Sequence, residues 1–394
     1  MSVVFVTEKG ESYLDLTFAQ ATELQELRFC RVSPTPVSGR WRIADVRKVG
    51  VAAIAGCEVR VIPKTPIENI VYMSSLGGMQ LRLGTADVLF GREASVPEAI
   101  VDAFLSAVGS ATRSGLLKGY RSAEESSPVV RGRWNIARQL AARPGIPLPV
   151  EVDYDEFTED IAENRILVTA LGVVRRLPGL SDNARHALRA LQVVFAEVSS
   201  LPRGQALPEV RPDRLNAHYT VALRLAKAIL DAVSWTHREG TVVGATFLVD
   251  MAAVFERYVA NRLAVALAGD GLEVAAQAQE WWLDTGRSVS LRPDIVISRR
   301  GAPVAVADTK YKVLGSGGGA PPNGDVYQAV AYAMAIGVSS AHLIYTADDV
   351  DARVIDVPFV GVRVYVHALP LAGSVAWLDR AVRELAGSLS HGIM

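Results

Sequence analysis

The strongest constraint on the fold of this 394-residue chain is an alternating run near its C-terminal end, Pro303–Val313. In an extended chain, Val304, Val306, Asp308 and Lys310 lie on one face of this run. Burying a lone charge is costly, so a carboxylate and an ammonium at the end of such a face need partners, a metal ion or water. The run therefore predicts a strand that leads from a hydrophobic core into a polar cleft.

A second predicted strand, Val289–Ile297, precedes this run and carries the pair Pro293–Asp294. Proline cannot donate to a strand ladder, so Pro293 indicates a sheet edge or an irregular point just before Asp294. The surrounding chain predicts the order helix, three strands, helix, strands. The expected elements are helix 247–268, strands 272–283, 289–297 and 303–313, helix 325–336, and strands 342–346 and 359–367.

The two predicted helices each offer polar side chains to the same site. Glu256 falls at the flank of the apolar face of helix 247–268, so its carboxylate can reach a cleft without full burial. Gln328 and Tyr332 are four residues apart on helix 325–336 and therefore lie one above the other. A surface salt bridge at the strand ends is the alternative interpretation, but five elements agree in order along the chain.

Phosphodiester hydrolysis requires a bound divalent cation, an activated water, and positive charge where the transition state becomes negative. Asp294 and Asp308 can give two carboxylates to Mg²⁺, with the backbone carbonyl of Thr309 as a third ligand and Glu256 as an outer ligand. Oxygen ligands suit Mg²⁺, which also keeps several waters. We expect no binding residues for any other cofactor.

The remaining polar residues have predicted roles in handling the attacking water. Lys310 can orient or deprotonate that water, or stabilise the transition state. Gln328 and Tyr332 can steer the lysine, a carboxylate or the scissile phosphate. The spacing of Pro293–Asp294, Asp308 and Lys310 resembles the signature of the PD-(D/E)xK nuclease superfamily. That resemblance implies a restriction-endonuclease-like α/β/α core in residues 241–394.

The residues before 240 contain no recognisable catalytic cluster. We expect residues 1–125 to form a β-rich module that contacts a partner. We expect residues 126–240 to form a mainly helical linker or stalk, with amphipathic helices at 181–201 and 215–237. The predicted class is thus a multidomain protein that combines α/β and α+β parts.

Two oppositely charged runs lie within this region. Residues 119–143 are locally basic, and residues 151–163 are strongly acidic. Each run can be a solvated face. Alternatively, the basic run contacts phosphates and the acidic run docks onto a basic partner surface.

Composition narrows the remaining possibilities. A net charge of −1 argues against a protein that holds DNA by bulk charge alone. Cys30 and Cys57 have no metal-ligand spacing and are expected to be buried thiols. We expect neither a signal peptide nor a membrane helix, and therefore a cytoplasmic location. The glycine-rich stretch 315–319 predicts a flexible loop and not a phosphate-binding loop, because no Gly-Lys-Ser/Thr follows.

Longer motifs carry a more specific resemblance. FLVDMAAVFERYV (247–259), LRPDIVI (291–297), ADTKYK (307–312) and DVYQAVAYA (325–333) are similar to the McrC family, the nuclease subunits of McrBC modification-dependent restriction systems. Softer similarities are IPKTPIENIVYM (62–73), GYR (119–121), RGRWNI (131–136) and YDEFTEDIAENRIL (154–167).

The resemblance implies a Mg²⁺-dependent endonuclease that cleaves double-stranded DNA in defence against phage. It also implies docking, through the N-terminal region, onto a McrB-like AAA+ GTPase oligomer that recognises modified cytosine, and stimulation of that GTPase. Two other hypotheses remain open. The chain could act mainly as an activator or adaptor of the AAA+ partner, or as a stand-alone DNA repair nuclease.

Overall fold

The computed structural model describes residues 2–75, 95–146, 148–177, 179–233, 246–277, 281–312, 320–346 and 353–393. The chain divides into two compact units, Met1–Ala99 with Val242–Met394, and Ile100–Thr241. The prediction of a mixed α/β chain with several domains is confirmed. The first unit joins both ends of the chain, so the unit boundaries differ from the predicted divisions at 125 and 240. The predicted loop 315–319 lies outside the described residues.

A six-stranded sheet forms the centre of the first unit. Three neighbouring strands of this sheet run parallel, and the other neighbouring pairs are antiparallel. The order is β11 (Leu272–Ala276), β14 (Ile295–Arg299), β15 (Ala302–Lys310), β16 (Ser340–Tyr345), β18 (Val362–Ala368) and β17 (Arg353–Val357). Helix α9 (Asn323–Ile336) connects the parallel strands β15 and β16, as a parallel pair requires a crossover.

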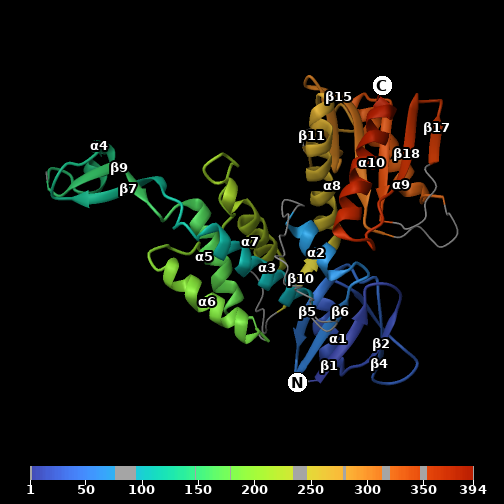
Figure 1. Ribbon diagram of the computed structural model, residues 1–394, viewed down its shortest axis with the longest axis horizontal. Coiled ribbons are helices and arrows are strands. Elements are labelled where there is room, and N and C mark those ends of the chain that lie inside the picture. The colour runs from blue at the N-terminus through green and yellow to red at the C-terminus, as the bar shows by residue number, and fades with distance from the viewer. Residues whose placement is uncertain are drawn as a thin grey trace. The chain divides into compact units, whose positions relative to one another are not determined.

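Helices cover both faces of this sheet. The face of β15 that carries Val306 packs against Ala329 and Ala333 of α9. Helix α8 (Met251–Leu267) contacts β11 and β15, and it packs beside α10 (Val375–Ile393), which contacts β16 (Figure 1). The alternation of β15 gives each face its own helices, so Asp308 and Lys310 share the α9 face with Val306.

The N-terminal segment folds together with the C-terminal part of the chain. Its main sheet has the order β1-β6-β5-β10, in which β10 (Phe247–Asp250) pairs antiparallel with β5 (Lys48–Ile54). The other strands are β1 (Ser2–Thr7) and β6 (Cys57–Ile62), and a smaller sheet holds β2 (Ser12–Asp15), β4 (Arg40–Ala44) and β3 (Arg31–Pro34).

Three predicted elements are wrong in part. The predicted strand 289–297 is two strands, β13 (Ser290–Leu291) and β14, which residues 292–294 separate. The predicted helix 247–268 starts only at Met251, because its first four residues are β10 and the carboxylate of Asp250 accepts hydrogen bonds from Ala252 N and Ala253 N at the helix start. The predicted strand 272–283 is two strands, β11 and β12 (Trp281–Trp282). Strand β12 pairs with β13 (Ser290–Leu291) instead of joining the large sheet.

A buried helix of the N-terminal segment, α2 (Ile67–Ser74), bonds to the C-terminal part. Nδ2 of Asn69 donates to the carbonyl oxygens of Leu371 and Gly373, both at 2.7 Å. The hydroxyl of Tyr72 donates to Asp379 at 2.6 Å. Asn69 is almost fully buried, so these bonds are costly to lose. The N-terminal segment is therefore part of the same folded unit as the large sheet.

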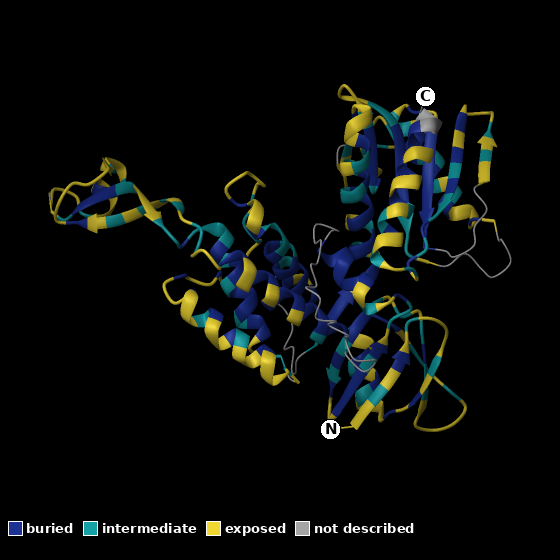
Figure 2. Cartoon of the chain, in the orientation of Figure 1, coloured by how far each residue is buried: buried dark blue, intermediate teal, exposed yellow. Residues whose placement is uncertain are grey.

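The second unit combines helices with a three-stranded sheet. Helix α5 (Ala162–Val174) contacts both α6 (Asp182–Val194) and α7 (Thr220–Ala232). The inward faces of these helices are buried (Figure 2). The predicted helices 181–201 and 215–237 are confirmed in shortened form as α6 and α7. The elements are α3 (Val96–Ala111), α5 (Ala162–Val174), α6 (Asp182–Val194), α7 (Thr220–Ala232), α4 (Ile136–Ala142), β7 (Gly119–Ser127), β8 (Arg133–Trp134) and β9 (Val150–Thr158), plus α1 (Phe18–Glu26) in the first unit.

Two smaller predictions can also be compared with the structure. Cys30 and Cys57 are free and buried, as expected. Among the residues that the structure describes, no helix combines the length and the apolar composition needed to cross a membrane.

Candidate active site

Asp308 and Lys310 lie at the carboxyl end of β15, on the face that packs against α9. Lys310 is in register with Tyr345 of the parallel neighbour β16, so both strands end at this edge. The Asp308 side chain is buried, with the residue 3% exposed, and its Oδ2 forms an ion pair with Nζ of Lys310. The predicted polar end of the strand is thus a paired carboxylate and ammonium, as the cost of burying either alone requires.

Asp294 joins them from the turn before β14. Its Oδ2 accepts hydrogen bonds from N of Thr309 at 2.7 Å and from Oγ1 of Thr309 at 2.8 Å. These two bonds hold the Asp294 carboxylate against the residue between Asp308 and Lys310. The sequence had indicated only the backbone carbonyl of Thr309, because its side chain alternates away from Asp308.

The protonation of Asp308 and of Lys310 depends on burial and on the charges around them. Burial and the nearby Asp294 carboxylate raise the pKa of Asp308 to about 7. Burial alone would lower the pKa of Lys310, but the Asp308 carboxylate outweighs it and the pKa is raised. At higher pH the site therefore holds two carboxylates against one ammonium, which favours an added cation.

Gln328 and Tyr332 of α9 hold Lys310 from the other side. Nζ of Lys310 donates to Oε1 of Gln328 at 2.8 Å, and Nε2 of Gln328 donates to the Tyr332 hydroxyl at 2.9 Å. That hydroxyl donates in turn to the carbonyl of Arg292 at 3.2 Å. Because each donor faces an acceptor, the amide of Gln328 has one favoured orientation, with its oxygen toward the lysine.

Glu256 lies nearby but is held separately. Its Oε1 accepts a hydrogen bond from Nε2 of Gln277 at 2.7 Å, and N of Gln277 donates to the carbonyl of Asp294 at 2.8 Å. Burial, then the Asp294 carboxylate, raises the pKa of Glu256. Within the described ranges, no group of three or more His, Cys, Asp or Glu side chains is arranged to hold a metal ion. Glu256 is thus not gathered with the two aspartates.

The residues nevertheless fit a hard cation. The donors that meet here are carboxylate oxygens, the type that Mg²⁺ prefers. Burial, and after it the Asp294 carboxylate, raises the pKa of Asp308, and a bound Mg²⁺ would offset both by stabilising the ionised carboxylate. Mg²⁺ needs few protein ligands, because it usually keeps several waters. Asp294 and Asp308 would hold it, with the Thr309 carbonyl as a further candidate.

A third carboxylate near this edge was not indicated by the sequence. Oδ2 of Asp325 accepts a hydrogen bond from the Tyr345 hydroxyl at 2.6 Å and lies 2.6 Å from Nζ of Lys312. Burial opposes ionisation of Asp325, but these two partners hold its pKa below the usual value. The clue in the sequence was Lys312, two residues after Lys310 on the same face. We interpret this pair as support for the strand end.

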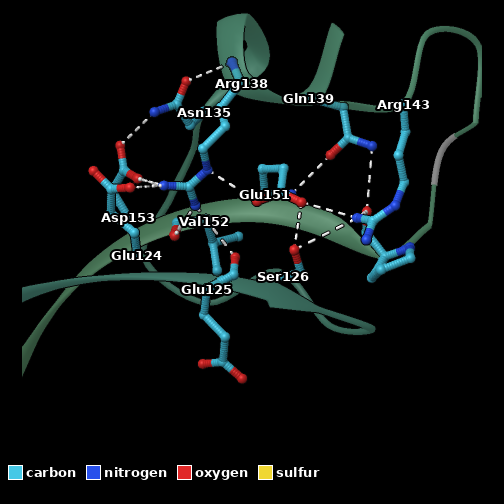
Figure 3. Close-up of polar contacts among 11 residues, drawn as sticks. Glu124, Glu125, Ser126, Asn135, Arg138, Gln139, Arg143, Glu151, Val152 and Asp153 are labelled. Atoms are coloured by element: carbon cyan, nitrogen blue, oxygen red, sulfur yellow. Dashed lines mark hydrogen bonds and ion pairs between the residues drawn. The ribbon is translucent and has the colours of Figure 1, made fainter. Parts of the chain in front are cut away.

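The two charged runs of the second unit bind each other. β7 and β9 pair antiparallel, and Figure 3 shows the Arg138 guanidinium among acidic side chains of both strands. Nε of Arg138 and an Nη of Arg143 each lie 2.9 Å from the buried Glu151 carboxylate. Further ion pairs are Arg121–Asp160 and Arg131–Glu125. These arginines are neutralised within the unit, which weakens the interpretation of the basic run as a phosphate-binding surface.

Comparison with known proteins gives the family. The family model described as McrBC, 5-methylcytosine restriction system component, matches residues 46–346. The chain belongs to the McrBC family. The resemblance seen in the sequence motifs is therefore confirmed. No curated protein matches the chain.

One solved structure shares the fold of this McrBC-family chain. One chain comes from a "refined half-complex from tetradecameric assembly of Thermococcus gammatolerans McrB AAA+ hexamers with bound McrC". It is 17% identical, with a TM-score of 0.56, and the match covers 98% of this chain and 100% of that chain. A chain of the Thermococcus gammatolerans McrBC complex is 20% identical over 68% of this chain and 88% of that chain, with a TM-score of only 0.43.

The buried ion pair predicts a measurable coupling in stability. In EDTA at pH 8, Lys310→Met should lower the free energy of unfolding by about 3–5 kcal/mol, because it leaves the Asp308 carboxylate buried without its cation. The double variant Lys310→Met/Asp308→Asn should lose less than Lys310→Met alone. Urea unfolding of the wild type, both single variants and the double variant measures this coupling.

The pH dependence follows from the raised pKa of Asp308. A raised pKa means that the folded state binds the proton more tightly than the unfolded state, so stability is lost as pH rises through about 7. The cost of Lys310→Met should therefore shrink between pH 8 and pH 5, as Asp308 takes up a proton. Costs that simply add in the double variant at pH 8, or a cost of Lys310→Met that is equal at pH 8 and pH 5, would contradict the pairing.

Proposed function

We propose that the chain is the Mg²⁺-dependent endonuclease subunit of a McrBC-like restriction system, and that it cleaves double-stranded DNA with a PD-(D/E)xK core. The observation that supports this most is the meeting of Asp294, Asp308 and Lys310 at one end of β15. The α9 pair Gln328 and Tyr332 adds an ordered contact to the lysine. A cytoplasmic location is part of the proposal.

Each residue then has a chemical task. Bound Mg²⁺ would neutralise phosphate charge and lower the pKa of a coordinated water. Asp294 and Asp308 would hold the ion through their carboxylate oxygens, and the two hydrogen bonds from Thr309 fix Asp294. Lys310 orients the attacking water or balances the negative charge of the transition state. Gln328 and Tyr332 fix the orientation of the Lys310 ammonium, and Glu256 acts as an outer ligand of the ion.

The second part of the proposal is an AAA+ partner. By the family membership, we infer that the chain docks onto a McrB-like GTPase oligomer that recognises modified cytosine, and stimulates its GTPase. The sheet of the second unit supports a docking role because it exposes large apolar side chains. Tyr120 and Phe157 are 77% and 59% exposed, and their rings are 5.1 Å apart. Others nearby in the chain are Val129, Val130, Trp134, Ile136 and Leu140.

Exposed apolar groups of this number are unusual on a surface that stays in water. They lie in β7, β8, β9 and α4 and the connections between them. Of these side chains only Tyr120 belongs to the predicted partner-binding module, residues 1–125, so the proposed docking surface lies mostly in the region predicted as a linker. The adaptor hypothesis predicts that this surface matters more than the nuclease site. The repair-nuclease hypothesis predicts cleavage without a partner or GTP.

Removing the site residues tests the nuclease. Asp308→Ala or Lys310→Ala should lower the rate of DNA cleavage by at least about 100-fold, the scale expected for a positioned acid–base or charged group. The assay uses methylated and unmethylated duplex DNA with Mg²⁺, with and without partner and GTP. A matched control is Arg299→Gln, which removes a charge at the opposite, exposed end of the β14–β15 hairpin and should cleave normally.

Undiminished cleavage by pure Asp308→Ala protein, folded as judged by its melting temperature, would rule out the assigned site. Cleavage by the wild-type chain alone, independent of GTP and methylation, would favour the repair nuclease.

Substitutions on the exposed sheet test the partner role. The double variant Tyr120→Ser/Phe157→Ser should reduce stimulation of the partner's GTPase by about tenfold, because it removes two large apolar contacts at a candidate interface. Asp308→Ala should leave stimulation at the wild-type level. GTP hydrolysis at increasing concentrations of the chain measures both. The opposite pattern, in which only the nuclease-site variant loses stimulation, would show that the roles are assigned to the wrong regions.

A further inference from the structure

A pocket of about 340 Å³ lies in the first unit, where the N-terminal segment meets the large sheet. Its polar lining includes Thr7, Lys9, Lys64, Thr65 and Thr346. Thr346 directly follows β16, and its N donates to the carbonyl of Lys310 at 3.2 Å. The pocket therefore borders the same strand ends that carry the candidate active site.

Lys64 is fixed beside the residue that follows the candidate catalytic lysine. Its Nζ lies 3.8 Å from the centre of the Tyr311 ring and 3.4 Å from the Tyr311 carbonyl oxygen. The Tyr311 hydroxyl shares a hydrogen bond of 2.9 Å with Oγ1 of Thr65. A cation over an aromatic face is held in place while keeping part of its charge free for an anion.

Among the described residues that line the pocket, the charged side chains are those of Lys9 and Lys64, and none is acidic. The Glu8 carboxylate accepts a hydrogen bond from the backbone N of Lys64 at 2.8 Å. Burial, the largest influence on Glu8, raises its pKa. Burial also lowers the pKa of Lys64, which shows that the ammonium lacks full solvation and would gain from an anionic ligand.

A buried hydroxyl adds an independent sign of a polar ligand. Thr346 is only 6% exposed, it lines the pocket, and its Oγ1 has no hydrogen-bond partner among the described residues. A buried hydroxyl without a partner carries a desolvation cost. Hydroxyl groups together with lysine ammonium groups are the donors that bind phosphate oxygens.

We propose that this pocket is a phosphate subsite that holds the DNA backbone next to the cleaved bond, with Lys64 and Lys9 as its cations. The subsite rests on the proposed nuclease function. It gives the N-terminal segment a role in binding DNA, beside its structural role. A chain with a net charge of −1 needs such local contacts to hold a polyanion.

The test is the salt dependence of DNA binding by the full chain. Fluorescence anisotropy of a labelled 20-base-pair duplex is followed from 50 to 300 mM salt, with Ca²⁺ and the Asp308→Asn background to prevent cleavage. Lys64→Met should weaken binding about fivefold and reduce the slope of log K against log salt by about one. Lys64→Arg should restore both, and Arg299→Gln, far along the same strands, should change neither.

A purely structural role for Lys64 makes a different prediction. If Lys64 only braces Tyr311, then Thr65→Val, which removes the bond to the Tyr311 hydroxyl but no charge, should weaken binding as much as Lys64→Met. The salt slope should then stay unchanged. Lys9→Gln gives a second variant at an exposed position, with an expected slope change in the same direction. Competition by inorganic phosphate tests whether the free anion occupies the pocket.

Normal affinity and slope in folded Lys64→Met and Lys9→Gln proteins would overturn the subsite. Failure of the Asp308→Asn protein, without further substitutions, to bind the duplex at 50 mM salt would also overturn the subsite. Failure of the nuclease proposal would instead appear as absent cleavage by the wild-type chain with partner, Mg²⁺ and GTP, a result that leaves the binding measurement unaffected.

Discussion

The site depends on one electrostatic constraint, the burial of the Asp308 carboxylate at the end of a hydrophobic strand face. Val306 on that face is almost fully buried, and Asp308 is 3% exposed. A carboxylate there needs a cation. The ammonium of Lys310 supplies one, but the Asp294 carboxylate, held by Thr309, restores the excess of negative charge. Two carboxylates beside one ammonium are unfavourable in the protein alone, but they suit a bound divalent ion that keeps its waters.

The fold supplies the supports that this site needs from distant parts of the chain. Helix α9 holds Lys310 through Gln328, and helix α8 brings Glu256 toward Asp294 through Gln277. The N-terminal segment completes the unit through β10 and α2. Lys64 of that segment rests on Tyr311, one residue after Lys310. A disturbance of the N-terminal segment can therefore reach β15, the strand that carries Asp308 and Lys310.

Much of the site follows from local periodicity, which sequence alone contains. The alternation through Asp308 and Lys310 predicted their shared face, and the four-residue spacing predicted the stacking of Gln328 on Tyr332, now seen as a hydrogen bond. The pairing of β5 with β10 was missed because those strands lie about 200 residues apart. From the sequence alone, the basic and the acidic run have separate interpretations, although Arg138 and Glu151 form an ion pair between them. Long-range pairing leaves no periodic trace in either strand.

Anomalous diffraction from crystals grown with Mn²⁺ tests most directly whether Asp294 and Asp308 together hold a divalent cation. Manganese takes the oxygen ligands that suit Mg²⁺ and scatters anomalously. The account predicts one or more peaks within about 2.5 Å of carboxylate oxygens of both aspartates, and none there in Asp308→Asn crystals. Crystals of the wild-type chain without a peak between Asp294 and Asp308, or with manganese bound only elsewhere, would contradict it.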